Sequence, residues 1–344
     1  MRQLIELQQQ LVPELLDVMR KRYLILHQVM LSDTIGRRSL AANLAMTERM
    51  LRAETDFLKD QGLLDIHASG MSISELGRKL LEQLEPYYNS MFGLSQLEER
   101  IRTYFGLTRV IIVPGDSAES PQTKRELGRV GSQVLRQALK PDDVIAVTGG
   151  TTIAQVANQL TTSAPMGSIC FVPGRGGLGQ SLDYQANTLA STMAKRTGGK
   201  YRLLHVPDHL GTEAFSSLMQ EPNIREIVDV IRSARIVVHG IGDAMVMARR
   251  RNLDRDLIES MESEGALAEA FGFYFDRDGA VVHKMQTVGL RLEDIVKTEV
   301  VIGIAGGSGK GEAIAAVMRF GHNDVLVTDE AAAKEVIALI EQQA

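Results

Sequence analysis

The chain has 344 residues, of which 44% are hydrophobic and 24% are charged, and its formal net charge is -5. This length allows two or three domains with cores of their own, and the composition is typical of a soluble globular protein. The negative net charge excludes a chain that is basic throughout, so any surface that binds nucleic acid has to be local.

No apolar run approaches the roughly 20 residues that cross a membrane, and acidic residues among the first leucines argue against a signal peptide. We therefore expect a cytoplasmic protein without a membrane partner. Cys170 is the only cysteine, which excludes an internal disulfide, and the seven histidines show no metal-ligand spacing with it. The sequence therefore predicts no structural metal, and we expect no cofactor.

Apolar residues recur at helical spacing over residues 1–22, where Pro13 is expected to split or kink the helix. A stripe this early packs either on the next domain or on a second subunit, and we favour a subunit contact.

Residues 23–85 predict a winged helix-turn-helix. The expected elements are three helices and two short strands, at residues 23–31, 37–44 and 48–61 and at 64–67 and 71–73. Thr47 is a preferred N-cap residue for the third helix, and Gly70 lies in the turn of the wing hairpin. In the third helix, Met50 and Phe57 are expected on the buried side with Leu51 and Leu58.

Positive charge is concentrated around the helix-turn-helix, since residues 37–52 contain four arginines and one acid. A recognition helix places its N-terminal residues in the major groove, where arginine pairs with guanine or phosphate. The predicted DNA contacts are Arg49 and Arg52 to bases or phosphates, Arg37 and Arg38 to phosphates, and Thr47 at the helix start. A three-helix packing unrelated to DNA remains the alternative.

From residue 107 onward, apolar strand segments alternate with helices, which predicts an α/β fold with a parallel sheet covered on both faces. The expected strands are residues 110–113, 144–147, 169–172, 203–206, 236–238, 300–304 and 325–327. We therefore divide the chain into a winged helix-turn-helix domain, residues 1–88, and a parallel-sheet domain, residues 89–344.

Glycine-rich turns follow four of these strands, at residues 148–152, 173–179, 239–243 and 305–310. Ligands of such sheets bind beyond the carboxyl ends of the strands, so these turns predict a pocket. Residues 174–179 match GxGxxG, but no acidic residue stands about 20 residues on, and the turn before Lys310 departs from the P-loop pattern. Neither turn therefore predicts a nucleotide site.

The first glycine turn has the features of an anion site. Gly149 and Gly150 end a buried strand, and Thr151 and Thr152 open a helix, so free N–H groups and a positive helix end face the turn. A plain strand-to-helix turn is the alternative.

Cations and polar residues surround these turns. Arg175, Lys310 and the arginine run 249–251 lie near strand ends, and two phosphates on one small molecule would need two such sets of cations. Glu269 and Gln185 lie in apolar segments that we interpret as helical, where they either bind sugar hydroxyls or are solvated.

Taken together, these motifs resemble the SorC family of bacterial sugar-responsive transcription regulators. The matching motifs are the helix-turn-helix, Leu97-Glu-Glu, Thr148-Gly-Gly-Thr-Thr152, Gly174-Arg-Gly-Gly-Leu-Gly179, His239-Gly-Ile-Gly-Asp243 and Ala305-Gly-Gly-Ser-Gly-Lys310. The resemblance covers the whole chain. It implies an operator-binding repressor of glycolytic genes, induced by fructose 1,6-bisphosphate, with an effector domain similar to sugar-phosphate isomerases and deaminases.

The resemblance also implies roles for individual residues. Gly149, Gly150, Thr151 and Thr152 would hold one phosphate, Arg175, Arg250, Arg251 and Lys310 would supply charge, and Gln185 and Glu269 would contact the sugar. Operators are usually palindromic, so we expect a homodimer or homotetramer.

The deaminases that the resemblance brings in use an acid and a histidine after the glycine turn, for ring opening and proton transfer. Here Asp243 is followed by Ala-Met-Val-Met-Ala without a histidine, so we expect a binding protein and not an enzyme. The alternatives are an isomerase or deaminase with an accessory DNA-binding domain, and a repressor whose inducer is a monophosphate.

Overall fold

The computed structural model describes residues 11–32, 34–44, 46–91, 93–177, 181–208 and 210–342. The chain divides into two compact units, Met1–Gln96 and Leu97–Ala344, called here the N-terminal and C-terminal units. The start of the predicted N-terminal stripe, residues 1–10, and the end of the predicted turn 173–179 lie outside the described residues.

The N-terminal unit contains the predicted three helices and wing. Its elements are α2 (Pro13–Leu31), α3 (Arg37–Asn43), α4 (Glu48–Asp60), β1 (Leu64–His67), β2 (Gly70–Ile73) and α5 (Glu75–Met91). Leu11 is helical, Val12 is not, and α2 begins at Pro13, so the helical stretch is interrupted just before this proline, as expected. Proline is tolerated in the first turn, where the missing N–H has no partner anyway. The Thr47 hydroxyl accepts a hydrogen bond from the Met50 N–H at 3.3 Å and caps α4, as predicted.

The buried face of α4 differs from the prediction. Met50 and Phe57 are 48% and 40% exposed, whereas Leu51, Thr55 and Leu58 are buried. The spacing of 51, 55 and 58 forms one narrow helical stripe, and Met50 and Phe57 lie beside it. The Arg22 guanidinium covers the Phe57 ring at 3.7 Å from its centre.

The C-terminal unit is built on a seven-stranded parallel sheet in the order β3-β13-β12-β7-β4-β5-β6. The strands are β3 (Arg109–Val113), β4 (Val144–Val147), β5 (Cys170–Pro173), β6 (Lys200–Tyr201), β7 (Ile236–His239), β12 (Val300–Ile304) and β13 (Val325–Asp329). This arrangement confirms the prediction of a parallel α/β sheet.

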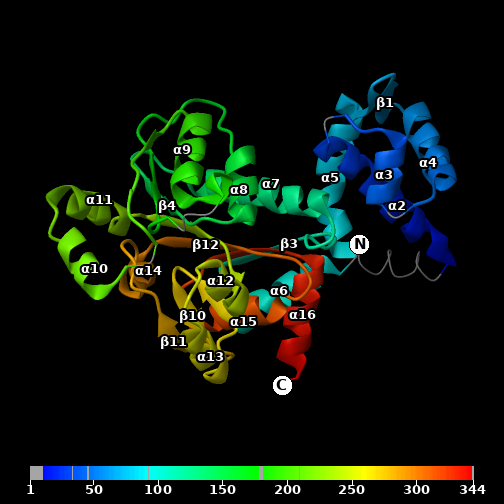
Figure 1. Ribbon diagram of the computed structural model, residues 1–344. Helices are drawn as coiled ribbons and strands as arrows, with labels where there is room; N and C mark the ends of the chain where they lie inside the picture. The colour runs from blue at the N-terminus through cyan, green and yellow to red at the C-terminus, as the bar shows by residue number, and fades with distance from the viewer. Residues whose placement is uncertain are drawn as a thin grey trace. The chain divides into compact units, whose positions relative to one another are not determined.

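Helices cover both faces of this sheet, with α7, α8 and α9 on one face and α6, α15 and α16 on the other (Figure 1). The helices of the unit are α6 (Leu94–Phe105), α7 (Pro121–Ala138), α8 (Thr151–Gln159), α9 (Ala186–Thr197), α10 (Thr212–Leu218), α11 (Pro222–Arg232), α12 (Ala244–Arg250), α13 (Arg255–Ser263), α14 (Leu292–Lys297), α15 (Gly311–Phe320) and α16 (Glu330–Glu341), with the short turn η1 (Leu182–Tyr184). The core between α7, α8, α9 and the sheet consists mainly of buried aliphatic side chains, together with Phe171 and Met193.

One predicted strand is wrong. Residues 203–206 do not form a strand, and the edge strand is instead β6. The backbone of Leu204 forms two hydrogen bonds with the Asn187 side chain. The Leu204 N–H donates to the amide oxygen at 3.0 Å, and the Leu204 carbonyl accepts from the amide nitrogen at 2.9 Å. A side-chain amide therefore takes the place of a neighbouring strand.

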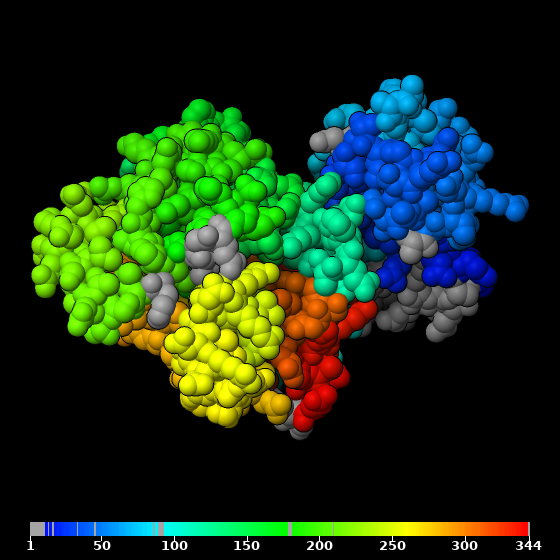
Figure 2. All heavy atoms as spheres, viewed as in Figure 1, coloured from blue at the N-terminus to red at the C-terminus, as the bar shows by residue number. Residues whose placement is uncertain are grey.

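A second, antiparallel sheet was not predicted. It has the order β11-β10-β9-β8, formed by β8 (Gly242–Asp243), β9 (Ala268–Ala270), β10 (Phe273–Phe275) and β11 (Val281–Lys284). Glu269 therefore lies in a strand and not in a helix, which corrects our interpretation of that segment. The yellow part of Figure 2 includes the lobe that β8 to β10, α12 and α13 form.

Candidate functional site

A cavity of about 760 Å³ lies at the carboxyl ends of the parallel strands in the C-terminal unit. The turns after β4, β5, β7 and β12 form its walls, together with Glu269 from β9. All the residues assigned to the effector from sequence line it: Gly149, Gly150, Thr151, Thr152, Arg175, Gln185, Arg250, Arg251, Glu269 and Lys310. The four glycine turns thus meet around one space, as parallel-sheet geometry requires.

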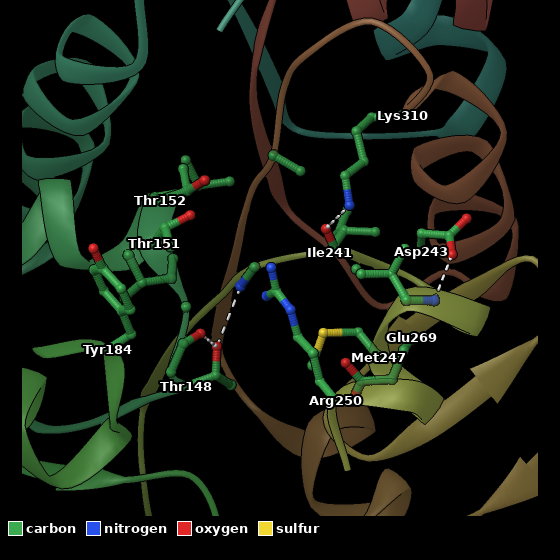
Figure 3. Close-up of a pocket in the computed structure, with 18 of the residues that line it drawn as sticks. Thr148, Thr151, Thr152, Tyr184, Ile241, Asp243, Met247, Arg250, Glu269 and Lys310 are labelled. Carbon is green, nitrogen blue, oxygen red and sulfur yellow. Dashed lines mark hydrogen bonds between the residues drawn. The ribbon is translucent and has the colours of Figure 1, made fainter. Parts of the chain in front are cut away.

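The start of α8 faces this cavity. Gly150 precedes the helix with a φ of 124°, and no side chain of the described residues caps the helix end. A Cβ on Gly149 would lie 2.6 Å from the Tyr184 carbonyl oxygen, so the close approach of these two segments requires glycine. The first N–H groups of α8 are available to an anion, and Thr151 and Thr152 lie on one side of the pocket (Figure 3).

Two other helix starts near the cavity, those of α12 and α15, are closed by side chains. Asp243 caps α12 by accepting from the Val246 N–H at 2.8 Å. At α15, the Glu335 carboxylate accepts from the N–H groups of Gly309 and Gly311, both at 2.8 Å. The turn before α15 therefore offers the cavity the Lys310 side chain, while its amides bind a carboxylate of the protein.

A buried ionic network forms one wall of the cavity. Asp208 accepts two hydrogen bonds from Arg175 and one from Arg251 at 3.0 Å. One oxygen of Glu269 accepts from Arg175 at 3.0 Å and from Arg251 and the Gly272 N–H at 2.8 Å each. The Tyr274 hydroxyl accepts from Arg251 at 2.8 Å, so the network connects four separate chain segments.

The network fixes its own ionisation. Burial alone would raise the pKa of Asp208, but the guanidinium groups of Arg175 and Arg251 hold the pKa below its usual value. Burial would likewise raise the pKa of Glu269, and the same two arginines and the Gly272 N–H lower it. Both carboxylates are therefore charged, and they balance the two arginines that the sequence analysis assigned to phosphate.

Two further cations, Lys310 and Arg250, line the same cavity. Lys310 hydrogen-bonds to the Ile241 carbonyl at 3.4 Å, and the side chains of Lys310 and Arg250 both point into the pocket (Figure 3). Burial lowers the pKa of the Lys310 ammonium, and Arg250 lowers it further against the opposing charge of Asp243. Arg250, and not Arg249, is the member of the arginine run that lines the pocket beside Arg251.

Sequence reasoning missed two charged residues here. Lys124 lines the cavity from the first turn of α7, and its place at the start of a helix that follows a strand was a signal that could have found it. Asp208 lies in an irregular segment, and no local pattern indicated its role.

In the N-terminal unit, the predicted DNA contacts fall into two groups. Arg49 and Arg52 are exposed in the first turns of α4, and neither forms an ion pair with another described residue. Arg37 pairs with Asp56 at 3.0 Å, and Arg38 pairs with Glu48 at 3.5 Å. Exposed pairs of this kind are weak, so both arginines can exchange a carboxylate for a DNA phosphate.

Within the described ranges, no group of acidic, histidine or cysteine side chains is arranged to hold a metal ion. No described helix is both long and apolar enough to cross a membrane.

Two family comparisons match the two parts of the chain. Residues 18–88 match the CggR N-terminal DNA-binding domain, and residues 89–338 match the Sugar-bind family of sugar-binding domains. The two family matches, on this fold, thus define a DNA-binding transcriptional regulator with a sugar-binding domain. The chain belongs to the SorC family of these regulators.

The similar proteins are named as transcriptional regulators, and two of them match nearly the whole chain. The central glycolytic genes regulator of Priestia megaterium is 47% identical over 98% of this chain and 99% of that protein. The regulator of the same name from Bacillus subtilis is 45% identical over 98% and 99%. A solved SorC family regulator from Enterococcus faecalis is 40% identical, with a TM-score of 0.65 over 70% of this chain and 99% of that one. These relatives confirm the prediction of a regulator over that of an enzyme.

Proposed function

We propose that this protein is a cytoplasmic repressor of glycolytic genes that releases its operator when fructose 1,6-bisphosphate binds in the cavity of the C-terminal unit. The observation that supports the effector most strongly is the uncapped start of α8 beside Arg250 and Lys310, in a cavity of about 760 Å³. The names of the two relatives support the target genes.

Charge and size support a sugar phosphate as the class of effector, and the second phosphate rests on the family resemblance. A sugar phosphate has a dianionic group for the helix start and the cations, and hydroxyls for Gln185 and Glu269. The cavity has room for a sugar with two phosphates. We also propose that this unit is similar in fold to sugar-phosphate isomerases. A sugar monophosphate is the alternative effector.

Thermal unfolding of the full-length protein with a panel of sugar phosphates tests the effector. A ligand that binds only the native state increases the free energy of unfolding by RT ln(1 + [L]/Kd), so Tm rises with ligand concentration. We expect fructose 1,6-bisphosphate to raise Tm more than fructose 6-phosphate or dihydroxyacetone phosphate, and fructose to have no effect. An equal shift by the monophosphates would contradict the choice of fructose 1,6-bisphosphate as the effector. No shift with any sugar phosphate would contradict the assignment of the cavity as the effector site.

The DNA contacts are tested on a duplex that the full-length protein selects from random sequence. We expect Arg49→Gln to weaken binding by about 1–3 kcal/mol and to reduce the salt slope by about one unit if the contact is to a phosphate. Lys59→Gln, at the other end of α4, is the matched control, since recognition helices contact bases with their N-terminal residues. Equal affinities of the two variants would exclude Arg49 as a contact.

Operator binding also implies an oligomer. Palindromic operators are read by symmetric pairs of recognition helices, so we propose a homodimer or homotetramer. In this scheme the sugar phosphate favours one arrangement of subunits over another, and the difference in its affinity for the two arrangements sets the size of the response.

A further inference from the structure

We propose that Lys124 contacts the phosphate of the effector and completes, with Arg250 and Lys310, a three-cation grip at the start of α8. The inference rests on the proposed function, because it adds a contact to the same effector cavity. It assigns a ligand contact to α7, a helix that lies outside the four glycine turns.

Helix packing places Lys124 beside the anion site. A Cβ on Gly128 would lie 2.5 Å from the Gln155 side chain, so α7 and α8 are in close contact at this level. Both helices follow parallel strands and run in the same direction. Lys124 lies one turn before Gly128, and Thr151 lies one turn before Gln155, so the two are at the same height on their helices. Lys124 and Thr151 both line the cavity.

Among the described residues, the Lys124 ammonium group has no hydrogen-bond or ion-pair partner. The Lys124 side chain is half-buried. Half-buried charged groups ordinarily have such partners. Its neighbour Arg125 is exposed and does not line the cavity, so the two adjacent cations of α7 differ in this respect.

The three cations that line the cavity repel one another. Burial lowers the pKa of Lys124, and the charge of Arg250 lowers it further. Burial also lowers the pKa of Lys310, and both Arg250 and Lys124 contribute in the same direction. Asp243 and, less strongly, Glu269 oppose this effect at Lys310, but Glu269 is already paired with Arg175 and Arg251. An excess of positive charge therefore remains, and a phosphate group with a charge of about −1.5 to −2 balances it.

Isothermal titration of fructose 1,6-bisphosphate into full-length protein tests the role of Lys124. We expect Lys124→Met, which keeps the apolar stem, to bind about tenfold to hundredfold more weakly, as for the loss of one charge-assisted hydrogen bond. Lys124→Gln removes the same charge and should weaken binding similarly. Lys124→Arg keeps the charge and should retain most of the wild-type affinity. The matched control, Arg125→Gln, removes the same charge from the same helix and should bind like the wild type.

Proton uptake gives a readout that a purely structural role of Lys124 would not change. Above neutral pH, an anion that raises the lowered lysine pKa values draws protons onto the protein, so the binding heat depends on the ionisation enthalpy of the buffer. We expect Lys124→Met to take up fewer protons than the wild type. Wild-type affinity and proton uptake in Lys124→Met would overturn the role of Lys124 and leave the proposed function standing. Failure of every sugar phosphate to bind wild-type protein would overturn both.

Discussion

Asp208→Ala is expected to lower the free energy of unfolding of the C-terminal unit by about 3–5 kcal/mol, because it leaves two buried guanidinium groups without their shared carboxylate. Arg175 and Arg251 have side-chain exposures of 8% and 2%, so water cannot replace that partner. Glu269 alone cannot neutralise both charges. Urea unfolding followed by circular dichroism is the measurement, since the chain has no tryptophan.

Asp229→Ala is the matched control for this prediction. Asp229 is an exposed carboxylate on α11, so its loss should change the unfolding free energy by no more than about 0.5 kcal/mol. A loss below about 1 kcal/mol in Asp208→Ala would show that the network contributes little to stability. In that case Arg175 and Arg251 would be available to a second phosphate.

The second large effect is expected for Gly150→Ala, which should weaken the binding of fructose 1,6-bisphosphate by at least tenfold. Gly150 has a φ of 124° and a ψ of 157°, a conformation that is essentially confined to glycine. A Cβ there meets no protein atom within 4 Å, so the effect comes from backbone strain. We expect relief of that strain to move the first N–H groups of α8 away from the anion, at about 1.5–3 kcal/mol for each charge-assisted bond lost. Isothermal titration measures the change.

Gly211→Ala is the control for the effect of a glycine substitution. Gly211 also precedes a helix, and a Cβ on it would likewise meet no atom within 4 Å, but its φ is -68°. Alanine adopts that conformation without strain, so effector binding should not change. If Gly150→Ala binds as tightly as Gly211→Ala, the start of α8 is not the phosphate site.

The parallel sheet could be predicted from sequence because its strands are short apolar runs between helices. The strand ends then placed the glycine turns around one cavity, since parallel strands share one carboxyl edge. The antiparallel sheet escaped prediction because β8 has two residues and β9 and β10 have three, which is too short for an alternating pattern to appear.

The electrostatics of the cavity could not be predicted from sequence. Arg175 was assigned to a phosphate as a single cation beside a glycine turn. Its partners Asp208 and Glu269 lie 33 and 94 residues further along the chain, and only the folded chain brings them together. Lys310 illustrates the opposite case, because a lysine that directly follows a glycine turn at a strand end had its place defined by local sequence.

The most direct test of the account is the affinity of the full-length protein for its selected operator duplex, measured by fluorescence anisotropy at fixed salt with and without saturating fructose 1,6-bisphosphate. Salt is held constant because affinity for DNA depends steeply on it. The account predicts that the bisphosphate weakens operator binding in the wild type and that fructose has no effect. Gly150→Ala should need a higher concentration of the bisphosphate for the same response. Unchanged operator affinity at saturating bisphosphate would contradict the proposed control of DNA binding by this cavity.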